Sequence, residues 1–203
     1  MLESRLAGAR FAVDVQHLYR ANHPGDRGAK YRLADGTSVF EASAATLYAQ
    51  ALTGWLRSRG AEVLTNDPVK GILVGIYPRR QREALAWGAD AYLACHLNAG
   101  GGAYGALELL ASDVSRSRPL AQRIAAELTA AIAVPCRTVD LALGVRGTVC
   151  IEVFAVQRPA LILEPFFGDY PPHQKLLSAP NLSLVGEAIG RGLADWWQFS
   201  GRA

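Results

Sequence analysis

The chain has 203 residues, of which 50% are hydrophobic and 19% charged, a composition typical of a folded globular domain. This length accommodates one α/β domain and is too short for two. The formal net charge is only +3 and no long run of Lys or Arg occurs, so no nucleic-acid binding is expected. The cysteines, Cys95, Cys136 and Cys150, lack a C-x-x-C spacing, so neither a zinc knuckle nor a disulfide framework is indicated.

Apolar runs and helical periodicity alternate along the chain and predict the elements in order. The predicted strands cover residues 10–16, 61–67, 91–99, 105–112, 148–154 and 159–167. The predicted helices cover residues 41–60, about 80–87 and about 181–199. A further helix is predicted to be capped by Ser117 and to carry an apolar stripe at Leu120, Ile124, Leu128 and Ile132. Residues 18–39 are predicted to form a long loop. Strands that alternate with helices predict a single α/β domain over residues 1–203, with an open, mostly parallel or mixed twisted sheet of about six strands and helices on both faces.

Three predicted strands end in residues that are costly to bury. His17 follows the first strand, His96 lies near the end of the 91–99 strand, and Glu164 follows the apolar run "ALIL". Ligands of such sheets bind beyond the carboxyl ends of the strands, so these side chains are expected to converge there. Imidazoles and carboxylates in this combination suit Zn²⁺, which takes three protein ligands in a catalytic site.

Each of these residues also has a purely structural interpretation. A histidine at a strand end can be a hydrogen-bonded structural residue, and Glu164 can pair with an arginine such as Arg146 or Arg158. Ser38 and Glu41 have the spacing of a helix capping box. His23 and His173 lie in predicted loops, where they are expected to be solvated or to serve as substitute ligands.

The glycines after His96 allow a second type of site. Gly100, Gly102 and Gly105 fit the G-x-G-x-x-G spacing of a dinucleotide-binding loop. That motif belongs after a strand and opens a helix, whereas "ALELLASD" is a poor helix start. We therefore expect a flexible rim rather than a phosphate cradle.

Taken in order, these motifs resemble the zinc-dependent N-acetylmuramoyl-L-alanine amidases of the amidase-3 type, found in bacterial autolysins and phage endolysins. The likeness extends from Phe11 to Trp197. "DVQHL" is similar to the family's Asp-x-Gly-His, "DRGA" to its Asp-x-Gly-Ala, "ADAYLACHLNA" to its Ala-Asp-x-x-x-Ser-x-His-x-Asn-Ala, and "RPALILEPFFGD" to its Pro-Ala-x-Leu-x-Glu-x-Gly-Phe. Gln16 and Phe166 stand where the family has glycine, and Thr65-Asn66 where it has Thr-Arg.

The resemblance implies one Zn²⁺ ion held by His17, Glu41 and His96, with Glu164 as the catalytic acid and base. It implies hydrolysis of the amide bond between N-acetylmuramic acid and L-alanine in peptidoglycan. Asn98, Arg80 and Arg146 are candidates for orienting the substrate or the site. Two alternatives remain open: a wall-binding module of the same fold that lost activity, and a zinc peptidase that cuts within the stem peptide.

The N-terminal stretch "MLESRLAGARFAVDVQ" lacks the apolar core of a signal peptide, and no window has the ~18 apolar residues of a membrane helix. We therefore expect synthesis in the cytoplasm, no membrane span, and action on the cell wall after a phage-type release. A monomer is expected.

Overall fold

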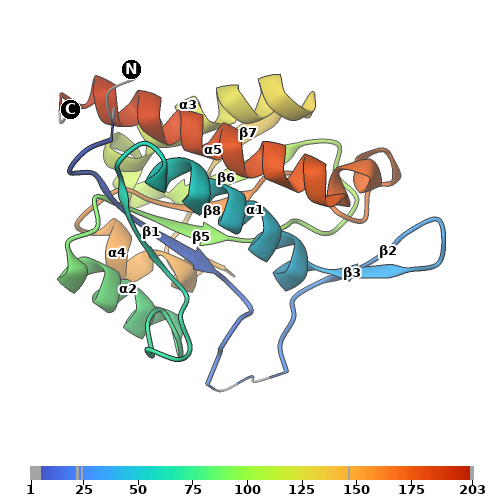
Figure 1. Cartoon of the computed structure of the whole chain (residues 1–203), viewed down its shortest axis with the longest axis horizontal. Helices are drawn as coiled ribbons and strands as arrows, with labels where there is room; N and C mark the ends of the chain where they lie inside the picture. Colours follow the sequence, from blue (N-terminus) through green and yellow to red (C-terminus); the bar gives the residue numbers. More distant parts are fainter. Residues whose placement is uncertain (1–5, 22, 24, 146, 202–203) are drawn as a thin grey trace.

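The structure is a computed structural model, and it describes residues 6–201 apart from 22, 24 and 146. Six strands form one mixed sheet at its centre (Figure 1). They are β1 (Arg10–Val15), β4 (Glu62–Thr65), β5 (Ala91–Cys95), β6 (Gly105–Leu110), β7 (Cys136–Leu141) and β8 (Ala160–Glu164). Their order is β4-β1-β5-β8-β6-β7. β4, β1, β5 and β8 are parallel, whereas β6 is antiparallel to β8 and parallel to β7. The carboxyl ends of β1, β5 and β8 therefore lie side by side.

Helices cover both faces of this sheet, as the sequence predicts. α1 (Glu41–Arg57), α3 (Val114–Ile132) and α5 (Ala179–Phe199) lie on one face, and α2 (Tyr77–Trp87) and the short α4 (Glu152–Ala155) lie on the other (Figure 1). Each face has its own hydrophobic cluster, a larger one under α1, α3 and α5 and a smaller one against α2 and α4. The predicted fold class is confirmed. No helix in the described part of the chain is both long and apolar enough to cross a membrane.

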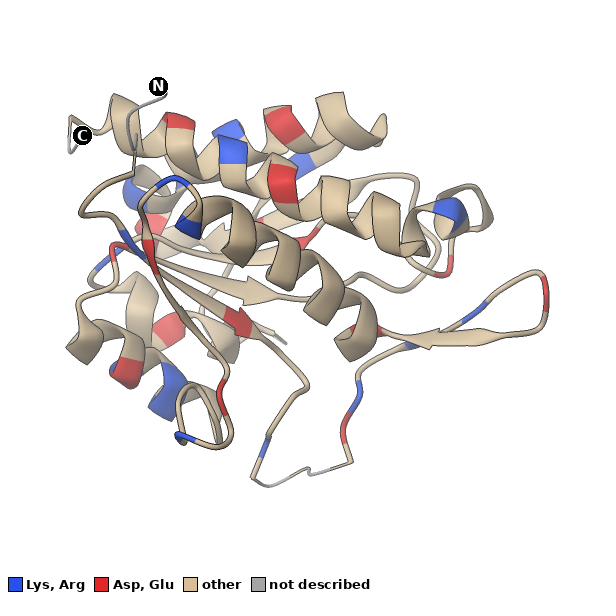
Figure 2. Ribbon diagram, in the orientation of Figure 1, with Lys and Arg blue, Asp and Glu red and all other residues tan. Residues whose placement is uncertain are grey.

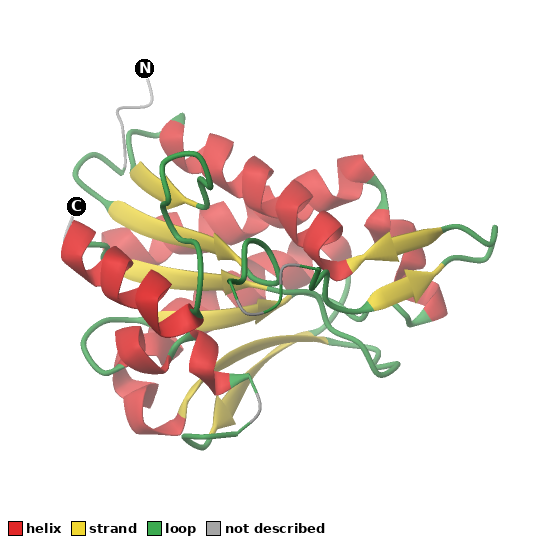
Figure 3. Cartoon of the chain, turned by 90° about the horizontal axis from the view of Figure 1, so that it is seen from below, coloured by secondary structure: helices red, strands yellow, loops and turns green. Residues whose placement is uncertain are grey.

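α1 carries charge only at its two ends, Glu41 and Arg57, and Figure 2 shows the uncharged stretch between them. It begins at Glu41, directly after a small hairpin formed by β2 (Lys30–Arg32) and β3 (Ser38–Phe40). Figure 3 shows this hairpin projecting beside the amino end of α1. Tyr31 attaches the hairpin to the body of the domain, because its ring is fully buried and its hydroxyl donates a hydrogen bond to the Leu97 carbonyl.

Two predicted elements are wrong. Residues 148–154 form a 3₁₀ turn (Thr148–Cys150) followed by α4, not a strand. The buried residues Cys150, Ile151, Phe154 and Ala155 are spaced as in a helix, and the Gln81 side-chain oxygen accepts hydrogen bonds from the amides of Val153 (2.8 Å) and Phe154 (3.1 Å). The sixth strand is β7 instead, which the sequence prediction missed. The predicted 18–39 loop contains the β2–β3 hairpin.

The helix cap predicted at Ser117 is also wrong. α3 already begins at Val114, so Ser117 lies within its first turns. Its hydroxyl is fully buried, donates to the Asp113 carboxylate (2.6 Å) and accepts a hydrogen bond from the Ala160 amide (3.0 Å). Ser117 thus ties α3 to the start of β8 rather than capping the amino end of the helix.

A close contact between α1 and α5 allows a stability test with a matched control. A Cβ at Gly186 of α5 would overlap the Tyr48 carbonyl and lie 2.7 Å from the Leu52 nitrogen in α1, whereas one at Gly54 would meet nothing within 4 Å. Gly186→Ala is expected to lower the free energy of unfolding by ~1–3 kcal/mol through overpacking. Gly54→Ala is expected to raise it by up to about 1 kcal/mol through helix propensity. Urea unfolding measures both, and equal effects would contradict the described α1–α5 packing.

Candidate active site

At the carboxyl edge of the sheet, the predicted site residues His17 and His96 come together, with ring centroids 5.0 Å apart. His17 lies two residues beyond the end of β1, His96 directly follows β5, and Glu164 ends β8. Because β1, β5 and β8 are neighbours, the three residues come from adjacent strands. Glu41 joins them from the first residue of α1. His17, Glu41 and His96 offer ligand atoms that all lie within 4.8 Å of one another.

The Glu41 carboxylate is the point on which the histidines meet. Its Oε1 atom lies 2.8 Å from Nδ1 of His96 and 3.3 Å from Nε2 of His17. The Leu97 amide also donates to Oε1 (3.2 Å). Burial raises the pKa of Glu41, but the hydrogen bonds and charges of the two histidines outweigh burial and hold that pKa well below its usual range. The site therefore favours an ionised carboxylate.

The other oxygen of Glu41 accounts for its position better than a capping box does. Oε2 accepts a hydrogen bond from the Ala29 amide (2.9 Å), and Phe40, not Ser38, precedes the helix without a side-chain cap. Gly28 has φ +68° and lies so close to Glu41 that any Cβ there would overlap the carboxylate. The "DRGA" segment thus packs against the Glu41 carboxylate and helps to fix its position.

His17 is held by the carboxylate of Asp26, the first residue of the "DRGA" segment, in a contact that the sequence does not predict. Its Nδ1 lies 2.9 Å from Oδ2 of Asp26, which also binds the Arg20 guanidinium. Burial raises the pKa of Asp26, but the Gly28 amide, His17 and Arg20 outweigh it and lower the pKa to about 2. Carboxylates placed in this way orient imidazoles whose other nitrogen binds a metal.

His96 also has a neighbour that sequence reasoning missed, in this case a thiol rather than a carboxylate. The Cys150 sulfur lies 3.6 Å from Nε2 of His96, on the side away from Glu41. The Tyr48 hydroxyl donates to the His96 carbonyl (2.7 Å) and fixes the backbone. Cys150 is a lone cysteine without a motif, so only the packing of the 3₁₀ turn against β5 reveals it.

Glu164 is the unusual acid of the site. Its Oε2 atom is buried and has no hydrogen-bond partner among the described residues. Burial, together with the negative charges of Glu41 and Glu108, raises its pKa well above the ordinary value. Of the two arginines suggested as its partner, Arg158 donates to the Ala89 carbonyl (2.5 Å) instead, and Arg146 lies outside the described residues.

Arg80 is buried rather than solvated at the helix surface. Its guanidinium is fully enclosed and donates to Asp14 Oδ1 (2.9 Å), to the Gly75 carbonyl (3.0 Å) and to the Leu18 carbonyl directly after His17. These contacts are with the protein and fit a role in orienting the site. Asn98, half-buried, accepts the Ala99 amide on its side-chain oxygen (2.9 Å).

The remaining sequence candidates lie apart from the three ligand atoms. His23 is exposed, as expected, but His173 is buried between the rings of Phe166 and Tyr170 rather than solvated. The glycine segment leads into strand β6, not a helix. Its Gly100 and Gly101 amides bind the Asp169 carboxylate (2.7 and 3.1 Å). The protein's own carboxylate thus takes the position that a phosphate would need, which removes the nucleotide-loop interpretation.

Removing Arg80 should reveal whether it organises the fold or contacts a ligand. Arg80→Met leaves Asp14 charged and buried, and breaking a buried pair in this way costs ~3–5 kcal/mol. The neighbouring Arg79 is exposed, so Arg79→Met is expected to change stability by less than ~0.5 kcal/mol. Denaturant unfolding of both variants gives the comparison. An Arg80→Met protein as stable as wild type would contradict the positioning role.

Comparison with known proteins identifies the fold. No family model matches the sequence, and neither does any curated protein. Among solved structures, the chain is similar to Cwp6 from Clostridium difficile (22% identity, TM-score 0.75), with 93% of this chain covering 29% of that one. It is also similar to the N-acetylmuramoyl-L-alanine amidases AmiC2 of Nostoc punctiforme (17%, TM-score 0.70, 95% and 99% of the two chains) and Ami1 from Mycobacterium smegmatis (14%, TM-score 0.72, 96% and 99%). The chain has the fold of these amidases, as its motifs predict.

Proposed function

We propose that this protein is a zinc-dependent peptidoglycan amidase that hydrolyses the amide bond between N-acetylmuramic acid and L-alanine. One observation carries the proposal: two imidazoles and a carboxylate converge at the sheet edge, and the adjacent strand ends in Glu164, whose buried Oε2 atom has no hydrogen-bond partner among the described residues. The fold shared with solved amidases supports it. The proposed place of action is the cell wall, with the protein as a monomer.

The ligand set fits one zinc ion. His17 offers Nε2, His96 offers Nδ1 and Glu41 offers Oε1, and each imidazole keeps its other nitrogen turned to a second partner. Two neutral imidazoles and one carboxylate are a common set for catalytic zinc. Bound zinc supplies a Lewis acid that polarises an amide carbonyl and makes water a nucleophile near neutral pH.

Glu164 is proposed to move the protons. Its raised pKa suits a group that takes a proton from the attacking water and holds it in an apolar environment. The same carboxyl then delivers the proton to the departing amine of L-alanine. Asp26 holds the His17 ring in place throughout, and Arg80 holds the backbone after His17. Asn98 and Arg146 remain proposed substrate contacts.

Zinc binding can be tested by thermal unfolding. At a zinc concentration near 100 times the dissociation constant, the wild-type melting temperature should rise by roughly 5–10 °C, because a ligand that binds only the folded state stabilises it. His17→Ala and His96→Ala should lose this rise. The exposed His23 provides the control, and His23→Ala should keep it. Equal rises in all four proteins would contradict the assigned ligands.

The reaction can be tested on purified peptidoglycan, with products identified by mass spectrometry. The wild-type protein should release peptides with free L-alanine amino termini and no new reducing sugars, and a chelator should stop the release. Glu164→Gln should lower the rate by ~10²–10⁴-fold while the zinc-dependent rise in melting temperature remains. Cleavage within the stem peptide would identify a peptidase instead, and binding without any product would identify a wall-binding module.

A further inference from the structure

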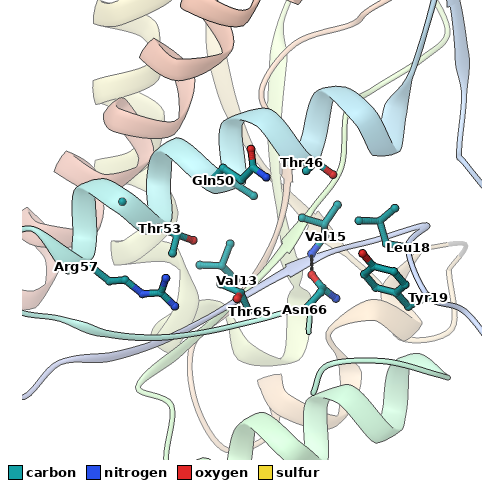
Figure 4. A pocket seen from close by; sticks show the side chains of 12 residues that line it. Val13, Val15, Leu18, Tyr19, Thr46, Gln50, Thr53, Arg57, Thr65 and Asn66 are labelled. Carbon is teal, nitrogen blue, oxygen red and sulfur yellow. Dashed lines mark hydrogen bonds between the residues drawn. The ribbon is translucent and has the colours of Figure 1, made fainter. Parts of the chain in front are cut away.

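A groove separate from the three ligand atoms runs along α1. It lies between α1 and the strands β1 and β4 and encloses about 360 Å³ (Figure 4). Leu18 and Tyr19, which directly follow the ligand His17, line one end, and Arg57 lines the other. The groove therefore begins beside the candidate active site and leads away from it.

One side of the groove is a polar stripe of α1. Thr46, Gln50, Thr53 and Arg57 recur every three or four residues along the face of α1 that lines the groove, and Figure 4 shows Thr53 and Arg57 reaching toward the strands. The amide of Gln50 and the hydroxyl of Thr53 have no hydrogen-bond partner within the described part of the chain. The opposite side offers Val15 and Leu18. The groove thus combines apolar area with free amide and hydroxyl groups, which suits a peptide with small side chains.

The helix keeps this groove open at Gly54. Glycine weakens a helix interior, and packing does not require it here, because a Cβ at Gly54 would meet nothing within 4 Å. Gly54 lines the groove, so a large side chain at this position would enter it.

The groove also has a defined charge. Arg57 is the only charged residue among those that line it. One guanidinium nitrogen donates to the Val63 carbonyl (2.9 Å), and no carboxylate in the described residues pairs with Arg57. An anionic group at this end would therefore find an exposed cation without a competing partner.

We propose that the groove binds the stem peptide in an extended form, with a carboxylate at Arg57. The inference rests on the proposed function, because the peptide would leave the active site from its L-alanine end. Glu41 to Arg57 spans 16 helical steps, or ~24 Å, of which an extended pentapeptide whose L-alanine lies at the ligand atoms covers ~17 Å. The Arg57 side chain reaches back along the groove toward Thr53 (Figure 4) and shortens the remaining distance to the carboxyl end of the peptide.

Binding can be measured without turnover, by calorimetry in the presence of a chelator. The probes are a synthetic stem pentapeptide with a free carboxyl end and the same peptide amidated there. The wild-type protein should bind the free acid about tenfold more tightly than the amide, the effect of one charge-assisted hydrogen bond. Arg57→Gln should remove that difference, and Gly54→Trp should abolish binding of both peptides.

Two matched variants complete the test. Arg82→Gln changes an exposed arginine of α2, and Leu47→Trp adds a large ring on α1 at an exposed residue that does not line the groove; both should bind like wild type. Circular dichroism checks that every variant is folded. Unchanged binding in folded Arg57→Gln and Gly54→Trp proteins, or no binding by wild type, would overturn the groove assignment. If the groove binds the peptide but the protein does not cleave peptidoglycan, the proposed function is wrong while the groove assignment stands.

Discussion

The Glu41 carboxylate joins segments that are far apart in the sequence. It receives the Ala29 amide on one oxygen, and His96, Leu97 and His17 on the other. Burying a carboxylate costs several kcal/mol unless hydrogen bonds or charges compensate, and here these partners do so. The start of α1, the segment that leads into the hairpin and the residues after β5 are consequently tied to one charged group.

A second buried charged group, the Asp14–Arg80 ion pair, lies close to His17, because Arg80 donates a hydrogen bond to the Leu18 carbonyl. Asp14 and Arg80 are both fully buried and paired, and Asn66 and Tyr92 donate to the same carboxylate. Gln16 donates to it as well (2.7 Å). This explains how the chain departs from the glycine expected before His17. The left-handed conformation falls on His17 itself, with φ +62°, so Gln16 needs no special backbone and can turn its amide inward.

The accuracy of sequence-based prediction varied with how local the signal was. Long apolar runs and amphipathic stripes predicted β1, β5, β8, α1 and α5, because their burial follows from their own periodicity. Residues 148–154 were misassigned, since their β-branched residues favour a strand while Gln81 and the core under α2 stabilise a short helix. β7 is an edge strand of mixed composition, and only pairing with β6 defines it.

For the site, costly polar groups at predicted strand ends were enough to nominate His17, His96 and Glu164, because this pattern is visible in one dimension. Glu41 was added only by the resemblance to a known family. The partners Asp26 and Cys150, the burial of Arg80 and the groove beside Gly54 depend on which segments meet in space. Strand order and helix packing determine which segments come into contact, and these contacts join residues that are dozens of positions apart in the sequence. A linear pattern carries the chemistry of each residue, whereas its neighbours, and therefore its charge state and accessibility, are properties of the folded chain.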